Sequence, residues 1–161
     1  EKVYAVDVGH GQLAESLKHK SCVVNMEGTD IRNISPENIG GEADFVCADV
    51  SFISITKIIP KIYELLRNDA VAVVLIKPQF EAGKKDIGKK GIVRDRKVHE
   101  RVLAEMDSFF RLTGFAPLNY TFSPIKGGSG NIEYLAELEK SSSNPPLCDF
   151  RKLIAEAFSC L

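Results

Sequence analysis

The sequence contains no tryptophan, no low-complexity tract and no apolar run near the roughly 18 consecutive residues that a membrane-spanning helix needs. The first residues also lack the charged, apolar and small-residue regions of a signal peptide. These absences argue against a membrane protein and predict a cytoplasmic one. What is present is an ordinary globular mixture, 44% hydrophobic and 27% charged over 161 residues, which predicts a single domain with one core.

Patterns that form metal sites or disulfide frameworks are missing as well. The four cysteines are widely spread with no CxxC pair, so buried reduced thiols are expected. The three histidines have no metal-ligand spacing, and a surface or capping role is favoured for each. No metal is therefore expected. The residues concerned are Cys22, Cys47, Cys148, Cys160, His10, His19 and His99.

Net charge is low, −1 from 21 basic and 22 acidic residues, so the overall charge does not indicate a nucleic-acid partner. The distribution along the chain is more informative. Residues 77–97 contain eight basic and three acidic side chains, a local excess of five positive charges. This segment is a candidate contact for a polyanion.

Six apolar runs, bounded by Gly, Asp or Pro, predict strands, and the first of them alternate with helical patterns. That alternation predicts an α/β fold. The first four runs are nearly continuous in hydrophobicity, as in a parallel sheet that is covered on both faces. The expected strands are residues 2–8, 22–26, 44–50, 71–77, 117–123 and 132–139, and the expected helices are residues 12–19, 53–66, 97–113 and 150–161.

The order of elements changes after Gly114, where two expected strands follow one another across residues 123–131 with no helix between them. This predicts an antiparallel hairpin at the C-terminal end of the sheet. The segment SSSNPPLCD then breaks the pattern. We therefore expect one domain over residues 1–140, with a linker and a closing helix of the same domain over residues 141–161.

Four polar residues stand out at or near the expected strands, namely Asp7, Asp49, Lys77 and Glu133. The first three lie at strand ends inside otherwise apolar runs, where an ionised group needs a partner or a ligand to offset its desolvation. Doubly wound sheets bind ligands beyond the carboxyl ends of their strands, which makes these residues candidates for a site. The alternative is that each is simply the polar residue that follows a strand.

A glycine-rich turn follows the first expected strand. Gly9-His10-Gly11-Gln12-Leu13-Ala14 fits the G-x-G-x-x-A pattern of dinucleotide-binding proteins, with Glu27 as a candidate acid for the ribose. An NAD-binding oxidoreductase is therefore one hypothesis, with Lys77 or His99 as its proton donor. The spacing to Glu27 is shorter than this motif usually has.

Four segments carry a more specific pattern. They are DVSFIS at residues 49–54, LIKPQFE at 75–81, GKKDIGKKGIVRD at 83–95 and SPIKGGSGNIEYL at 123–135. Together they resemble the TlyA group of FtsJ-like ribosomal RNA 2′-O-methyltransferases, a group also called haemolysin A. The resemblance extends from Val3 to about Leu138.

This resemblance implies a Rossmann-like S-adenosylmethionine methyltransferase sheet, mostly parallel with a C-terminal antiparallel hairpin. FtsJ-like enzymes surround the target ribose hydroxyl with a Lys-Asp-Lys-Glu tetrad, and Asp49, Lys77 and Glu133 occupy the last three places. Such folds hold the cofactor with residues that correspond to Asp7, Thr29 and Asp30, and Asp49 is assigned to both sets. The basic segment is the implied contact with ribosomal RNA, through Lys84, Lys85, Lys89, Lys90 and Arg94.

The sequence also departs from the family pattern. The family begins with a strand whose glycine-rich turn cradles the cofactor's methionine moiety, preceded by the first lysine of the tetrad, and neither is found here. The family's small N-terminal RNA-binding domain of the S4 type is also missing. We therefore expect a fragment with its first strand absent, exposed backbone groups in the sheet, weak cofactor binding and no activity alone.

The leading hypothesis is thus an S-adenosylmethionine-dependent methyltransferase that acts on ribosomal RNA or a ribosomal subunit. In such an enzyme Lys77 would help remove the proton of a 2′-hydroxyl, a poor nucleophile. The alternatives are the NAD-dependent oxidoreductase and a non-catalytic RNA-binding or haemolytic protein. No strongly basic amphipathic helix supports haemolysis.

Overall fold

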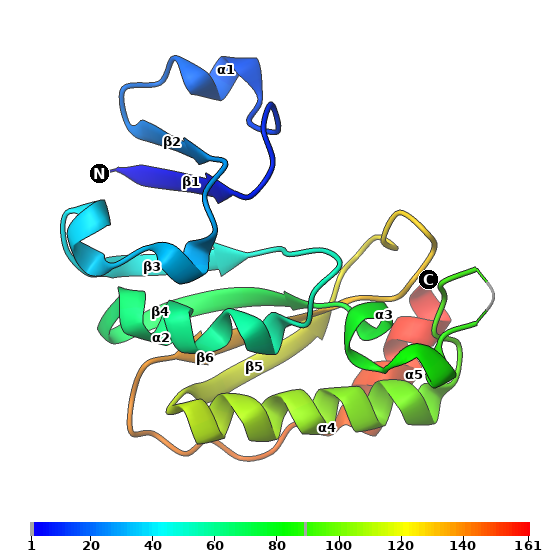
Figure 1. Cartoon of the computed structure of the whole chain (residues 1–161). Coiled ribbons are helices and arrows are strands. Elements are labelled where there is room, and N and C mark those ends of the chain that lie inside the picture. The colour runs from blue at the N-terminus through cyan, green and yellow to red at the C-terminus, as the bar shows by residue number, and fades with distance from the viewer. Residues whose placement is uncertain (1, 89) are drawn as a thin grey trace. The chain divides into compact units, whose positions relative to one another are not determined.

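The structure is a computed structural model that describes residues 2–88 and 90–161. It divides into two compact units, Glu1–Ala43 (unit 1) and Asp44–Leu161 (unit 2). No sequence pattern predicted a division after Ala43. The two units are described separately below (Figure 1).

Unit 1 is built on two parallel strands, β1 (Val3–Asp7) and β2 (Val23–Glu27), in register from Val3 opposite Val23 to Asp7 opposite Glu27. The helix expected at residues 12–19 is only one turn, α1 (Glu15–Lys18). Two 3₁₀ turns follow, η1 (Ile31–Asn33) and η2 (Pro36–Ile39). Among the described residues of unit 1, Ile34 is the one buried side chain.

Unit 2 contains a four-stranded sheet in the order β3-β4-β6-β5. Its strands are β3 (Ala43–Ala48), β4 (Leu66–Ile76), β5 (Ala116–Phe122) and β6 (Tyr134–Glu139). β6 lies between β4 and β5 and pairs antiparallel with both, which confirms the predicted C-terminal hairpin. In β4 from Ala70 onward and throughout β6 every second residue is buried, the period expected of strands that pack one face on a core.

The longest helix, α4 (Arg96–Thr113), begins and ends at clear signals. The side chain of Asp95 accepts a hydrogen bond from the backbone N–H of Lys97, and Gly114 ends the helix in the left-handed conformation at φ 102°. Its buried face has helical spacing and contacts β5. The side chains on that face are His99, Val102, Leu103, Met106, Asp107 and Phe110.

The remaining helices are short. The helix expected at residues 53–66 is divided into η3 (Ile55–Lys57) and α2 (Ile59–Leu65), and β4 begins directly after it at Leu66, five residues earlier than predicted. α3 (Pro78–Glu81) and η4 (Lys84–Asp86) precede α4. The closing helix α5 (Phe150–Cys160) packs against α4 and β5.

Two burial predictions are wrong. β1, β2 and β3 contain no buried residue, although their hydrophobic runs predicted strands covered on both faces. The cysteines were predicted to be buried, yet Cys22, Cys47 and Cys160 are exposed and Cys148 is half-buried. Cys47 lies on β3, a strand in which no residue is buried on either face. All four are free thiols, as expected.

Candidate active site

Strand pairing brings two of the predicted residues to one edge of the sheet. Ile76, the last residue of β4, pairs with Tyr134, the first residue of β6. Lys77 follows Ile76, and Glu133 precedes Tyr134. Because the two strands are antiparallel, both charged residues leave the sheet at the same end. Asp49 lies one residue beyond the end of β3.

Lys77 is a buried lysine with two polar partners. It is 9% exposed, and its Nζ lies 2.5 Å from Asp49 Oδ1 and donates a 2.9 Å hydrogen bond to Ser51 Oγ. The Asp49 side chain is 67% exposed, so the pair opens to solvent on the carboxylate side. Asp49 and Lys77 therefore form an ion pair at this edge of the sheet. A buried ammonium needs such partners to offset its desolvation.

Glu133 is also buried, at 7% exposure. Its carboxylate occupies the space where any residue other than glycine at position 127 would carry its Cβ atom. Its Oε1 accepts a 2.7 Å hydrogen bond from Gln79 Nε2. A Cβ added to Gly127 would overlap that same oxygen. Among the described residues Gln79 is the hydrogen-bond partner of the Glu133 carboxylate, and Lys77 makes neither a hydrogen bond nor an ion pair with it.

The segment KPQFE accounts for much of this arrangement, because each of its side chains has a separate role. Lys77 meets Asp49, Pro78 opens helix α3, and Gln79 holds Glu133. The Phe80 ring lies 5.9 Å from Lys77 Nζ, within the range of a cation–π contact. Glu81 accepts hydrogen bonds from Ser54 Oγ at 2.6 Å and from the Ile55 N–H at 2.8 Å.

The carboxyl group of Glu81 is partly desolvated by its packing. Burial raises its pKa, and the hydrogen bonds from Ser54 and Ile55 oppose that shift. Those bonds fasten the loop after β3 to the turn after β4, 26 residues further along the chain. The positions of Asp49 and Ser51 therefore depend on the same segment that carries Lys77.

An exposed aromatic residue stands beside this group. Phe52 is 88% exposed and has φ 67°, the left-handed region that a bulky residue rarely adopts. Its ring lies 5.4 Å from that of Phe80. A large apolar side chain held outward on a strained backbone is typical of binding loops.

The predicted cofactor residues Asp7, Thr29 and Asp30 all lie in unit 1. Asp7 ends β1, is exposed, and accepts a 2.6 Å hydrogen bond from the Gly9 N–H. The Thr29 N–H donates to the Asp7 carbonyl at 3.0 Å, which brings these two residues together. Hydrogen bonds from Arg32, with its charge, lower the pKa of Asp30 to about 2.

Glu27 has a different role from the one that the dinucleotide hypothesis gave it. Its Oε1 accepts hydrogen bonds from the backbone N–H groups of Gln12 at 2.5 Å and Leu13 at 2.8 Å. Backbone donation from Leu13 and the Asn25 amide lower its pKa to about 2. In a dinucleotide-binding turn, such backbone N–H groups donate to the pyrophosphate. Here they already donate to the Glu27 carboxylate, whose negative charge would repel a pyrophosphate. The geometry of the turn argues against NAD.

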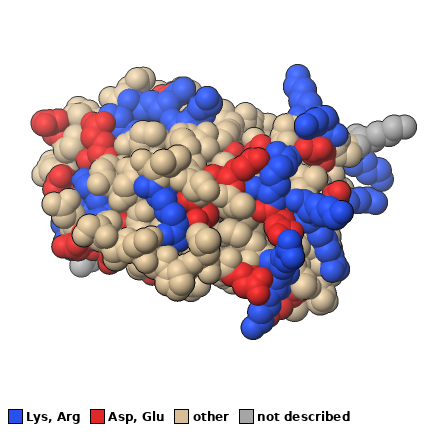
Figure 2. All heavy atoms as spheres, turned by 90° about the horizontal axis from the view of Figure 1, so that it is seen from below, with Lys and Arg blue, Asp and Glu red and all other residues tan. Residues whose placement is uncertain are grey.

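The predicted RNA-contact residues lie between α3 and α4. Lys84, Lys85, Lys90 and Arg94 are exposed, and Lys89 lies outside the described residues. Asp86, one of the acidic residues of this segment, is paired with Arg101 at 2.6 Å. Figure 2 shows many Lys and Arg side chains gathered at one end of the face in view, with acidic ones between them.

Three residues that the sequence did not single out support the site, namely Ser51, Gln79 and Asn131. Ser51 and Gln79 stood within the quoted segments DVSFIS and LIKPQFE, but nothing in those segments assigned them a partner. His99 was expected at the surface or in a cap, and this is wrong because its ring is completely buried. Asn131, in SPIKGGSGN, is 1% exposed.

The fold and this site define an α/β protein of the methyltransferase type. At 15% identity and a TM-score of 0.51, the N-methyltransferase NodS from Bradyrhizobium japonicum shares the fold, over 90% of this chain and 74% of that one. The model of the FtsJ-like methyltransferase family matches residues 1–140. The chain belongs to that family.

Relatives with higher identity narrow the comparison. YqxC of Bacillus subtilis is 48% identical over 136 residues, covering 84% of this chain and 48% of YqxC. The 16S/23S rRNA (cytidine-2′-O)-methyltransferase TlyA of Mycobacterium tuberculosis is 42% identical over 132 residues, covering 82% and 49%. A solved structure from Streptococcus thermophilus is 41% identical with a TM-score of 0.94, covering 99% and 58%. The chain spans about half the length of these curated relatives.

No helix in the described residues is long and apolar enough to cross a membrane.

Proposed function

We propose that this chain is the catalytic part of an S-adenosylmethionine-dependent enzyme that methylates a ribose 2′-hydroxyl of ribosomal RNA. The observation that carries the proposal is the buried Lys77, held between Asp49 and Ser51 at the edge of the sheet where Glu133 also leaves it. The names of relatives such as TlyA agree with this chemistry. A cytoplasmic location, where ribosomes are found, is part of the same proposal.

The chemistry follows from the donors of Lys77. An ammonium has three N–H donors, and Asp49 and Ser51 accept from it in the structure, which leaves a third for the oxygen of a substrate hydroxyl. That hydroxyl must lose its proton as its oxygen gains a methyl group, and the proton would pass to solvent water, which reaches the pair on the exposed Asp49 side. Lys77 would hold the oxygen and disperse the charge that develops on it, while Asp49 fixes the direction of the ammonium. Glu133 would orient the ribose.

Unit 1 offers acceptors that fit the proposed cofactor. When bound, S-adenosylmethionine would supply a methyl group on a sulfonium. Asp7 presents an exposed carboxylate suited to ribose hydroxyls, and Thr29 adjoins it through the backbone. We propose Asp7, Thr29 and Asp30 as the cofactor residues of unit 1. Asp30 would contact the cofactor while its carboxylate still accepts the hydrogen bond from Arg32 that is present in the structure.

The basic segment and Phe52 suit a folded RNA. Lys84, Lys85, Lys90 and Arg94 can contact phosphates without reading sequence. Phe52 offers an exposed ring on which a nucleotide base can stack. A ribosomal subunit is the proposed substrate, and an S4-type domain in the full-length protein is a proposed further RNA contact.

The test is a methylation assay with the protein at the full length that its gene encodes. The protein is incubated with S-adenosylmethionine and separated ribosomal subunits, and the RNA is then cleaved in alkali. A 2′-O-methyl group blocks cleavage at its own position, because the 2′-oxygen is the attacking nucleophile. We expect one or a few new protected positions. Methylation on a base, or no transfer to any ribosomal RNA, would contradict the proposal.

A second experiment tests the cofactor and the expected inactivity of the present chain. Calorimetric titration compares S-adenosylmethionine with NAD, in this chain and in the gene-length protein. We expect S-adenosylmethionine to bind the gene-length protein and to bind this chain weakly. Binding of NAD to this chain would favour the dinucleotide hypothesis instead.

A further inference from the structure

A buried amide joins the basic segment to the loop that carries Glu133. Asn131 Oδ1 accepts a 3.0 Å hydrogen bond from the Val93 N–H, and its Nδ2 donates a 2.9 Å bond to the Gly91 carbonyl. The Asn131 side chain thus bonds both a backbone N–H and a backbone carbonyl of the segment 91–93. These two groups lie 38 and 40 residues away in sequence. At 1% exposure, the amide makes these bonds without competition from water.

A second buried group holds the same segment. His99 Nε2 lies 3.0 Å from the Val93 carbonyl, and its Nδ1 lies 2.9 Å from the Tyr134 hydroxyl. Burial lowers the pKa of His99, so the ring is neutral near pH 7. A neutral ring has one donor, and a carbonyl can only accept, so Nε2 carries the hydrogen and Tyr134 donates to Nδ1. Val93 is therefore fixed from two sides.

The other end of the Asn131 connection reaches Glu133. The backbone carbonyl of Asn131 accepts a 2.9 Å hydrogen bond from the Gly127 backbone N–H. Gly127 in turn is the residue against which the Glu133 carboxylate lies, where a Cβ would overlap it. Each step from Val93 through Asn131 and Gly127 to Glu133 is a direct contact.

The segment held by Asn131 and His99 lies between two of the proposed RNA contacts. Residues 91–93 are flanked by Lys90 and Arg94, two of the exposed cations proposed to contact RNA phosphates. We propose that Asn131 is a positioning residue that couples the RNA-contacting segment to Glu133. RNA phosphates bound by Lys90 and Arg94 then fix where the Glu133 carboxylate stands relative to the target ribose. This inference rests on the proposed function.

Replacement of Asn131 tests the coupling in the gene-length protein. Asn131→Ala is compared with Asn68→Ala, an exposed asparagine of β4 whose side chain makes no hydrogen bond within the described part of the chain. We expect Asn131→Ala to raise KM for the ribosomal subunit and also to lower kcat at saturating substrate, by roughly tenfold to a hundredfold, the scale of a misplaced catalytic group. The affinity for S-adenosylmethionine should not change.

The combination with Arg94 separates coupling from simple support of the fold. Arg94→Ala alone should raise KM and should also lower kcat, by less than Asn131→Ala does, because the phosphate contact is what positions Glu133 through Asn131. If Asn131 transmits that contact to Glu133, the double variant should show less than the product of the two single effects on KM. Equal kcat and KM in Asn131→Ala and the unchanged protein, or strictly multiplicative effects in the double variant, would overturn the inference.

A measurement on the unchanged protein keeps the test valid if Asn131→Ala does not fold. Hydrogen exchange is followed with and without a ribosomal RNA fragment that binds. Coupling predicts that RNA slows exchange at Val93 and at Gly127 together, and protection at Val93 alone would overturn it. An unchanged protein that binds RNA but transfers no methyl group would contradict the proposed function, while the exchange result would still decide the coupling.

Discussion

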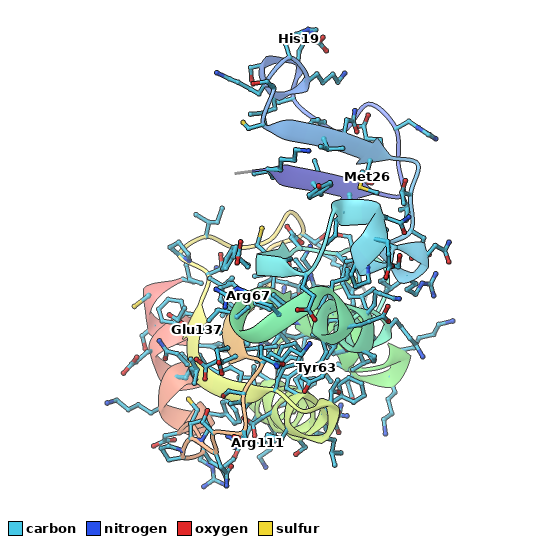
Figure 3. All side chains as sticks on the ribbon, turned by 90° about the vertical axis from the view of Figure 1, so that its left-hand side faces the viewer. His19, Met26, Tyr63, Arg67, Arg111 and Glu137 are labelled. Carbon is cyan, nitrogen blue, oxygen red and sulfur yellow. The ribbon has the colours of Figure 1, made fainter. Side chains whose placement is uncertain are left out.

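Units 1 and 2 hold their candidate functional residues in different ways. In unit 2 the partners of Lys77 and Glu133 come from 26 and 54 residues away and stand on a continuous core. In unit 1 Asp7 and Asp30 are held by residues two positions away, and Ile34 is the one buried side chain among the residues described. Figure 3 shows the contrast, with side chains crowded around Tyr63 and Arg111 in unit 2 and His19 of unit 1 extending outward.

The difference indicates that the two sets of residues depend on different forces. Groups that meet through long-range contacts on a packed core keep their geometry without a ligand, as a reaction that needs a fixed approach requires. Groups held by local hydrogen bonds on a sparse core adjust more easily and gain order when a ligand binds. Cofactor binding is therefore expected to stabilise unit 1 more than unit 2.

The largest expected effect is the loss of activity in Lys77→Ala. The gene-length variant should lose about 10²- to 10³-fold in kcat, the usual loss when one donor to a developing negative charge is removed. Its thermal midpoint should change little, because the contacts of Lys77 serve the site and not the core. Lys57→Ala, an exposed lysine of η3, is the matched control for a lost charge. Retained turnover in Lys77→Ala would remove this residue from the mechanism.

The next effect concerns the core. Phe110 of α4 is completely buried in unit 2, so Phe110→Ala should lower the free energy of unfolding by about 3–5 kcal/mol. Val24 of β2 is half-buried in unit 1, and Val24→Ala should cost about 1 kcal/mol or less. Denaturant unfolding of both variants measures the two values. Equal losses would show that unit 1 has a core as well organised as that of unit 2.

A smaller, local effect is expected at the glycine-rich turn. Glu27→Gln removes the charge that accepts from Gln12 and Leu13, so amide exchange at these two residues should become faster while unit 2 is unaffected. With its folded pKa lowered to about 2, Glu27 stabilises the turn fully above the unfolded value of 4.5, and this contribution is lost as the pH falls toward 2. The control variant Glu42→Gln should leave exchange at Gln12 and Leu13 unchanged. Unchanged exchange in Glu27→Gln as well would contradict this role.

The smallest effect is a pH dependence from His99. Because burial lowers its folded pKa below 6.5, the unfolded chain takes up a proton first as the pH falls. Stability should therefore be independent of His99 above about pH 7 and decrease below about pH 6.5. His99→Phe should be less stable at neutral pH, with a weaker decrease between pH 7 and pH 5. Denaturant midpoints across this range measure the slope, and equal slopes would mean that folding does not lower the pKa of His99.

The sequence predicted the placement of elements better than the contacts between them. Strand-end patterns pointed to Asp49 and Lys77, which follow β3 and β4 of one sheet, whereas Glu133 was expected inside a strand and in the structure precedes β6. The Gln79–Glu133 and Asn131–Val93 bonds had no such signal, since a side-chain bond between residues 38 or 54 apart leaves no period in the sequence. His99 was misjudged for a similar reason, because its burial depends on Tyr134 and on Phe158 of α5.

The pairing of β4 with β6 also sets the distance between two residues of the candidate site. Lys77 and Glu133 each adjoin one member of the Ile76–Tyr134 pair, so their separation is set by strand register. A slip of one residue would turn the side chains of β6 to the other face, and a slip of two would carry Glu133 along by roughly 6.6 Å. Either slip would leave a sheet with much of its hydrogen bonding intact and no working site. Under the proposed function, a chain with a slipped register would therefore be inactive and would not methylate a different atom.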